Sequence, residues 1–164
     1  IMKRKFDFAL FDTSLFRDII RYYPRRTHVH SFDENPPKTW EEVYKVYYSW
    51  AIIRQHYGDD EKIERSEFLL EMPCDECSQI PDLSEIIKYV MKTGETFDEP
   101  TFGQPAADWM IKKERVDYVY YDFEVFDNWT NQGYRFAFTE GETLKFCTWL
   151  DKINQYALEH GEEI

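Results

Sequence analysis

Residues 116–150 read VDYVYYDFEVFDNWTNQGYRFAFTEGETLKFCTWL, and this stretch decides the fold that we expect. Its first part alternates with a period of two, which is the period of a β-strand. One side of that strand carries the apolar residues Val119, Tyr121, Phe123 and Val125. Turn residues at 127–133 and a renewed alternation at Tyr134, Phe136 and Phe138 then predict an antiparallel hairpin.

A helix is expected directly after this hairpin. Thr139 and Glu142 have the spacing of a capping box, in which each side chain bonds the backbone of the other residue. Apolar residues follow at helical spacing, at Leu144, Cys147, Leu150, Ile153 and Ala157. Gly161 stands where a glycine commonly ends a helix. The chain therefore ends in a predicted hairpin and helix.

Upstream of residue 116 the sequence predicts mostly helices. The clearest begins at Thr39, which forms a capping box with Glu42, and ends at Gly58. Other helices are expected over 14–23, 61–72, 82–94 and 106–114, with a strand over 3–10 and loops over 24–38 and 95–105. We find no internal repeat. The expected fold is one α+β domain over residues 2–164, with helices from the first two-thirds packed against the C-terminal antiparallel hairpin and the final helix.

The charge of the chain favours some partners over others. The 164 residues include 32 acidic and 20 basic side chains, for a formal net charge of −12. Nucleic acids and anionic membranes attract basic proteins, so we expect no direct contact with either. A basic protein partner is the natural complement, although the charge could also serve only solubility. Three cysteines and the lack of about 18 consecutive apolar residues favour a cytoplasmic protein.

The predicted partner-binding residues come from the most acidic stretch. If residues 60–72 are helical, Asp60, Glu64, Glu67 and Glu71 form one stripe along that helix. Asp75 and Glu76 extend it. Tyr118 and Tyr120 are added because tyrosines often anchor protein interfaces. The alternative is an ordinary solvated helix face.

The function favoured by these features is non-enzymatic. We expect an acidic module that docks on a basic surface of a partner protein and blocks it by imitating nucleic acid. Acidic inhibitors of restriction or CRISPR nucleases (anti-CRISPR proteins) from phages and mobile elements share this size and charge. Immunity proteins that neutralise nuclease toxins share it too. The likeness is one of composition, since no motif of a specific family is present.

Two alternatives remain open. The first is a metal-assisted hydrolase that uses Asp122 and Glu124 or the cluster Asp59-Asp60-Glu61, because paired carboxylates can hold Mg²⁺ or transfer protons. The residues around 117–127 offer no basic side chain to hold a phosphate, which weakens this interpretation. The second is a small zinc-stapled scaffold, in which the ligands would be His28, His30, Cys74 and Cys77. No other cofactor is expected.

Overall fold

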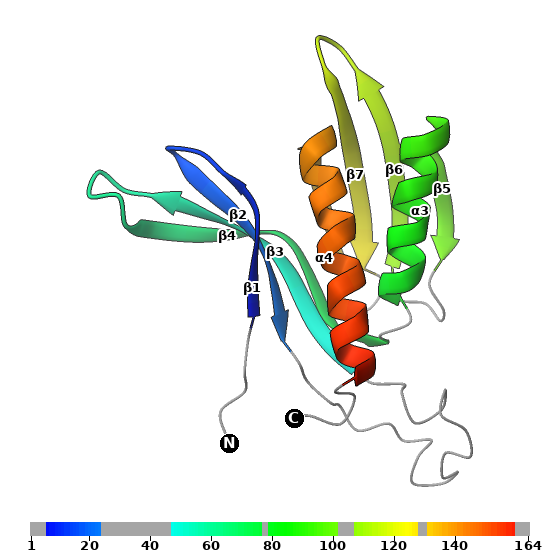
Figure 1. Ribbon diagram of the computed structural model, residues 1–164, viewed down its shortest axis with the longest axis horizontal. Coiled ribbons are helices and arrows are strands. Elements are labelled where there is room, and N and C mark those ends of the chain that lie inside the picture. Colours follow the sequence, from blue (N-terminus) through cyan, green and yellow to red (C-terminus); the bar gives the residue numbers. More distant parts are fainter. Residues whose placement is uncertain (1–5, 24–46, 77–78, 102–106, 128–130, 160–164) are drawn as a thin grey trace, which may run out of the picture.

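The structure is a computed structural model that describes residues 6–23, 47–76, 79–101, 107–127 and 131–159. Over these ranges the chain forms two antiparallel four-stranded sheets and two helices (Figure 1). Four strands are followed by a helix, and the same order then occurs a second time. The described chain is therefore mostly β and is built from two similar halves, which the sequence did not reveal.

In the first sheet, called sheet A here, three of the four strands fall where the sequence predicted helices. Its strands are β1 (Phe6–Asp12), β2 (Phe16–Tyr23), β3 (Tyr47–Tyr57) and β4 (Ile63–Glu76), and they pair in chain order. The strand expected near the N-terminus is confirmed. The helices expected over 14–23 and 61–72 are wrong, and so is the second half of the one expected from Thr39 to Gly58.

The physical reason lies in residues that are buried on both faces of this sheet. Ile20 and Ile52 are paired and belong to the main core, whereas the paired Ile19 and Ile53 form a second, smaller cluster with Ala51. Burial on both faces removes the polar positions that would show a period of two. An unbroken apolar run of this kind fits a helix as well as a strand.

The second sheet, sheet B, contains the predicted hairpin. Its strands are β5 (Phe97–Thr101), β6 (Ala107–Arg115), β7 (Val119–Asp127) and β8 (Gln132–Thr139), again paired in chain order. The hairpin of β7 and β8 is confirmed, and Tyr121, Phe123 and Val125 are buried on one face as expected. The helix expected over 106–114 is wrong, because Trp109 and Ile111 pair with Val125 and Phe123.

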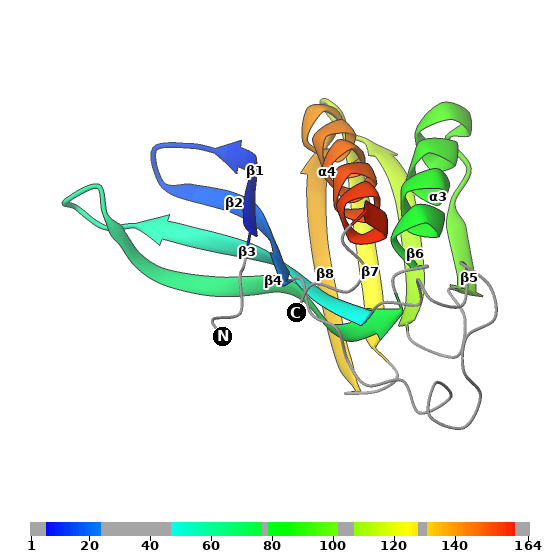
Figure 2. The ribbon, with the colours of Figure 1, turned by 60° about the horizontal axis from the view of Figure 1, so that its bottom comes forward.

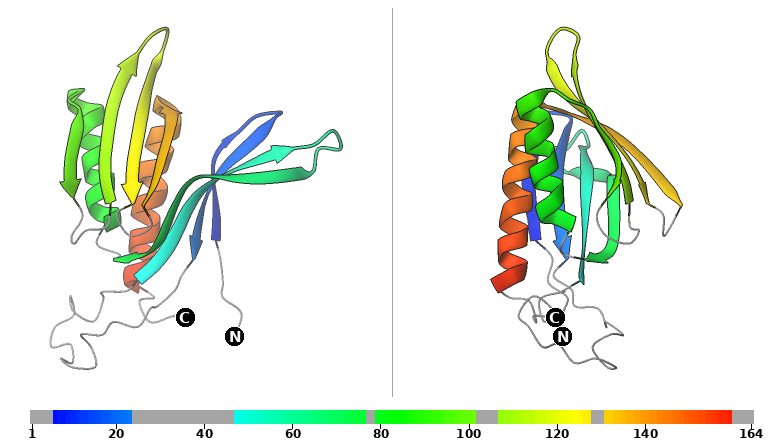
Figure 3. Two further views of the ribbon diagram at one scale, coloured as in Figure 1. Left: turned by 180° about the vertical axis from the view of Figure 1, so that it is seen from behind. Right: turned by 90° about the vertical axis from the view of Figure 1, so that its right-hand side faces the viewer.

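Two of the predicted helices are confirmed, namely α3 (Gln79–Thr93) and α4 (Glu140–Glu159). Gly94 follows α3 with a φ of +74°, a left-handed conformation that glycine adopts without strain. The capping box of α4 is formed, since the Thr139 backbone N–H donates to Glu142 Oε1 at 3.3 Å and the Glu142 N–H donates to Thr139 Oγ1 at 3.3 Å. Both helices cover the same face of sheet B (Figures 1 and 3).

Helix α4 joins the two sheets into one core. Phe146 is buried, with its ring 6.1 Å from Trp50 in sheet A and 5.7 Å from Phe138 in sheet B, measured between centroids. Farther along the helix, the Trp149 Nε1–H donates to the backbone oxygen of Ala9 in β1 at 2.8 Å. The expected architecture of helices packed on a terminal hairpin is therefore wrong. Two sheets and two helices share the core instead.

The stripe predicted on α4 is confirmed at Cys147, Leu150 and Ile153, which are buried. Leu144 is the exception, with 56% of its surface exposed. Phe146, which lies outside the predicted stripe, is fully buried and contacts both sheets.

Replacing Phe146 with Ala tests this view of the core. The change removes a ring that both sheets contact, so we expect the free energy of unfolding to fall by about 3–5 kcal/mol. Urea denaturation followed by fluorescence measures the loss. Leu144→Ala on the same helix is the matched control and should cost no more than about 0.5 kcal/mol. Equal losses in the two variants would contradict the central role of Phe146.

Candidate functional site

The ends of the two hairpins of sheet A project away from the helices (Figures 1 and 2). We call residues 11–17 and 55–68, which form these ends, the arm. The two hairpins are bonded to each other there, because the Tyr57 N–H donates to the Leu15 carbonyl at 3.0 Å and the Tyr57 hydroxyl donates to Asp12 at 3.1 Å. The arm is thus a single four-stranded end and not two loose loops.

Local bonds fix both turns of the arm. Thr13 Oγ1 accepts from the backbone N–H of Leu15 at 3.1 Å and of Phe16 at 3.0 Å, which closes the first turn. In the second turn, Asp60 Oδ1 accepts from the Lys62 N–H at 3.1 Å, and Glu61 has a φ of +63°. These bonds hold both turns of the arm in one geometry.

Exposed apolar side chains gather on the arm. Nine large apolar residues are exposed among the described residues, and four of them are here: Phe11, Leu15, Ile63 and Phe68. Leu15 is 71% exposed and Phe68 is 52% exposed. Strand register places Ile63 and Phe68 on one face of the arm and Phe11 on the other. Exposed apolar residues that share a face, such as Ile63 and Phe68, are typical of an interaction surface.

The arm also carries unpaired carboxylates. The arm contains six acidic and three basic residues. Glu67 accepts a bond from His56 Nε2 at 2.9 Å, and this bond lowers the pKa of Glu67 below its ordinary value. Asp59, Glu61 and Glu64 have no side-chain hydrogen bond or ion pair within the parts of the chain that the structure describes. The arm therefore presents negative charge that its own lysines and arginines do not neutralise.

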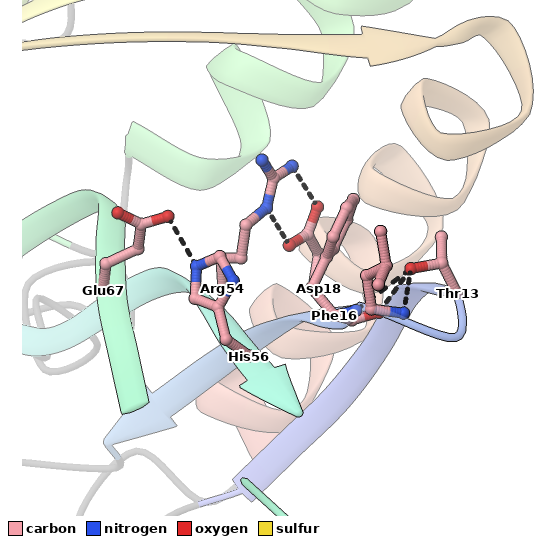
Figure 4. A network of polar contacts seen from close by, with 7 residues as sticks. Thr13, Phe16, Asp18, Arg54, His56 and Glu67 are labelled. Atoms are coloured by element: carbon pink, nitrogen blue, oxygen red, sulfur yellow. Dashed lines mark hydrogen bonds and ion pairs between the residues drawn. The ribbon is translucent and has the colours of Figure 1, made fainter. Parts of the chain in front are cut away.

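An ion pair between the buried Asp18 and the half-buried Arg54 lies at the base of the arm (Figure 4). Arg54 donates from Nε and Nη2 to the two carboxylate oxygens of the buried Asp18, at 2.8 and 2.9 Å. The guanidinium carbon also lies 4.0 Å from the centre of the Phe16 ring. Bonding to Asp18 raises the pKa of Arg54 above its ordinary value, so this arginine stays charged. Such bidentate pairs set direction as well as distance.

The predicted acidic stripe is not formed, because residues 63–76 are a strand. Glu67 is paired with Arg54 and Glu71 with Ala51, and these pairs lie on opposite faces of sheet A. Asp60 lies in the turn before the strand, whereas Asp75 and Glu76 lie at its other end. Tyr118 is 62% exposed and stands beside Tyr120 in the hairpin of β6 and β7. The partner-binding role of these residues stays a prediction.

The two carboxylate groups offered for a hydrolase are separate alternatives and lie on different sheets. Asp122 accepts from Arg135 Nη2 at 2.9 Å, and Glu124 lies 3.6 Å from Nε of the same arginine. The cluster Asp59-Asp60-Glu61 belongs to the turn of the arm, on the other sheet. Burial raises the pKa of the Cys147 thiol to about 12, so this cysteine is not a thiolate nucleophile. The hydrolase alternative stays a prediction.

The proposed zinc ligands fall largely outside the described residues. His28, His30 and Cys77 lie there, and Cys74 is part of β4. Within the described ranges no three metal-binding side chains come together. Neither α3 nor α4 has the length and apolar character needed to cross a bilayer.

The apolar residues of the arm were not predicted from the sequence. Leu15 was placed in the helix expected over 14–23, and Ile63 and Phe68 fall in the helix expected over 61–72. The one available signal was the sequence GlyAspAspGluLys at 58–62, whose glycine and aspartates are typical of a tight turn between two strands.

No protein-family model and no curated protein matches this chain. Three solved structures resemble it in fold. The plant transcriptional regulator PBF-2 is 9% identical, with a TM-score of 0.43 over 97% of this chain and 85% of that chain. WHY1 from Arabidopsis thaliana is 9% identical, with a TM-score of 0.45 over 96% and 88%. WHY3 from the same plant is 10% identical, with a TM-score of 0.39 over 94% and 87%.

Likeness at this level does not show what the present chain binds. Contact with nucleic acid can no longer be excluded, however, because one of the three is described as a transcriptional regulator. We correct the expectation of no direct contact with nucleic acid. We also correct the expectation of a nucleic-acid mimic of the anti-CRISPR or immunity-protein kind.

Glu142 allows a test of the capping box that begins α4. Burial raises the pKa of Glu142 above its ordinary value, and the nearby Asp18 raises it further. The protonated form is therefore favoured in the folded state. Its contribution to stability is full below the ordinary glutamate pKa and is lost as the pH rises through the raised pKa. Glutamine also fits this position of a capping box.

We therefore expect Glu142→Gln to be about as stable as the wild type near pH 4 and more stable near pH 8. Thermal melts of both proteins across this range measure the difference. Since all other titrating groups are shared, the difference reports Glu142 alone. A variant that loses stability relative to the wild type as the pH rises would refute the stated environment of this carboxyl group.

Proposed function

We propose that this protein is a non-catalytic binding module that docks on a positively charged surface of a partner protein with its arm. The observation that carries the proposal is the combination found on the arm. Four exposed apolar side chains share the arm with three carboxylates, Asp59, Glu61 and Glu64, that have no partner in the described residues.

The two kinds of side chain have different tasks in such an interface. Burial of Leu15, Ile63 and Phe68 against a partner would contribute affinity, at about 25 cal/mol for each Å² of apolar surface removed from water. The carboxylates Asp59, Glu61 and Glu64 would speed association with a basic surface and reject an acidic one. The carboxylates complement the apolar side chains, because apolar burial alone gives little selectivity between partners.

The geometry of the arm also suits this task. Its turns are closed by Thr13 and Asp60, and its base is held by the Asp18–Arg54 pair. A surface that is already ordered loses little conformational entropy on binding. Projection of the arm away from α3 and α4 lets a partner reach both of its faces (Figure 2).

Capture of partners from extracts treated with nuclease tests the proposal. Wild-type protein should retain basic proteins, and added salt should release them because the contact is charge-driven. The double variant Leu15→Ser/Phe68→Ser should lose them, with affinity for the purified partner at least about tenfold weaker. Leu144→Ser removes an apolar residue of similar exposure on α4 and should retain them.

A second pair of variants tests the charge contribution alone. Asp59→Asn/Glu64→Gln should slow association with the same partner, whereas Glu114→Gln/Asp117→Asn removes two charges outside the arm and should not. Equal recovery of the partner by the arm variants and their controls would rule out the arm as the docking surface. Retention of nucleic acid in place of basic proteins, in a parallel capture from extracts not treated with nuclease, would rule out the proposed class of partner.

A further inference from the structure

The face of sheet B that carries no helix has a shallow hollow of about 440 Å³. Helices α3 and α4 lie on the opposite face of this sheet (Figure 3). The hollow spans all four strands, and its lining includes Asp98, Asp108, Met110, Glu124, Phe126 and Arg135. Its volume lies within the range of ordinary binding sites.

Negative charge and apolar surface meet in this hollow. Three of its lining residues are carboxylates and one is an arginine. Arg135 is already engaged by Asp122 and Glu124. Within the described ranges, by contrast, Asp98 and Asp108 have no ion pair or side-chain hydrogen bond. The hollow therefore presents two carboxylates that can receive a cation.

One row across the sheet places a carboxylate beside an open aromatic face. Asp108 in β6 pairs directly with Phe126 in β7, and Phe126 pairs with Gly133 in β8. Glycine has no side chain to cover the neighbouring ring. A Cβ atom at Gly133 would lie 3.9 Å from Phe126 Cδ2, which shows how closely a side chain there would approach the ring. Phe126 is accordingly 41% exposed.

Elsewhere in this protein, a carboxylate and a phenyl ring together hold a guanidinium group. Asp18 and Phe16 hold the guanidinium of Arg54 between a carboxylate, at 2.8 Å, and a phenyl ring, at 4.0 Å. Asp108 and Phe126 offer the same two groups on adjacent strands. No described arginine or lysine is stacked on the Phe126 ring.

We infer that this hollow binds an arginine side chain of a partner protein. The guanidinium lies over the Phe126 ring and pairs with Asp108, while Asp98 adds negative charge and Met110 contacts the aliphatic stem. Arginine suits the site better than lysine, because its planar cation stacks on rings and is weakly hydrated. Arg135 does not compete, since two other carboxylates hold it one row away.

This inference does not depend on the arm. It names a second contact, on the other sheet, that a basic partner could use. The two surfaces can be tested separately, because no residue of the hollow belongs to the arm. If the proposal for one surface is contradicted, the proposal for the other surface is therefore unaffected.

Titration of the whole protein with blocked pentapeptides, followed by the amide signals in NMR spectra, tests the inference. One peptide has a central arginine, the second a lysine and the third a citrulline, which keeps the shape of arginine without its charge. The arginine peptide should shift the signals of Asp108, Phe126 and Gly133 in a saturable way. It should bind about threefold or more tightly than the lysine peptide.

Three variants identify the groups that bind. Asp108→Asn should weaken binding of the arginine peptide about threefold or more, and Phe126→Leu should weaken it about two- to fivefold. Glu114→Gln is the matched control, since it removes one charge from another residue of β6 outside the hollow. It should change the affinity by less than about twofold. Leu15→Ser/Phe68→Ser should also leave the affinity unchanged.

Several results would overturn the inference. Equal shifts with the citrulline peptide would show that the charge is not recognised. Equal affinity for arginine and lysine with no effect of Phe126→Leu would show general attraction to negative charge. Unchanged binding in Asp108→Asn, an exposed position where the fold should be unaffected, would overturn it even if Phe126→Leu did not fold.

Discussion

The burial of Phe146 between two sheets is the contact on which the rest of this structure depends. Its ring meets Trp50 on one side and Phe123 and Phe138 on the other, so one side chain of α4 belongs to the core of both halves. Four antiparallel strands alone leave a sheet with two faces to cover, and here two helices cover one face of sheet B. Through Phe146 and Trp149, the same helix also fixes the direction in which sheet A leaves the core.

This arrangement leaves two surfaces free for binding, and both combine carboxylates with apolar or aromatic side chains. The arm has Leu15 and Phe68 among acidic residues, and the hollow of sheet B has Phe126 beside Asp108. Inside the protein, the same combination is satisfied by Arg54 between Asp18 and Phe16. The negative side chains behind the net charge of −12 are therefore not spread evenly over the solvated surface. Part of it stands beside apolar groups, where the lower local dielectric strengthens its attraction for a cation.

The sequence predicted elements whose signals are local. The capping box of Thr139 and Glu142, the glycine after α3 and the alternation along β7 each depend on residues close together in the chain. Strands β2 and β3 were missed because Ile19 and Ile20 are buried on opposite faces, which hides the period of a strand. The hollow could not be found at all, since Asp108 and Phe126 meet only through strand register. Phe126 does share the outward side of β7 with Asp122 and Glu124, an aromatic residue at a solvent position that hinted at a use.

Hydrogen–deuterium exchange of Phe146→Leu tests most directly whether one side chain holds the two halves together. If it does, amide protection falls by the same amount in β3 of sheet A and β7 of sheet B, because the two sheets open as a single unit. Loss of protection confined to β7, β8 and α4, with β3 unchanged, would show that sheet A is stable by itself and would contradict this account.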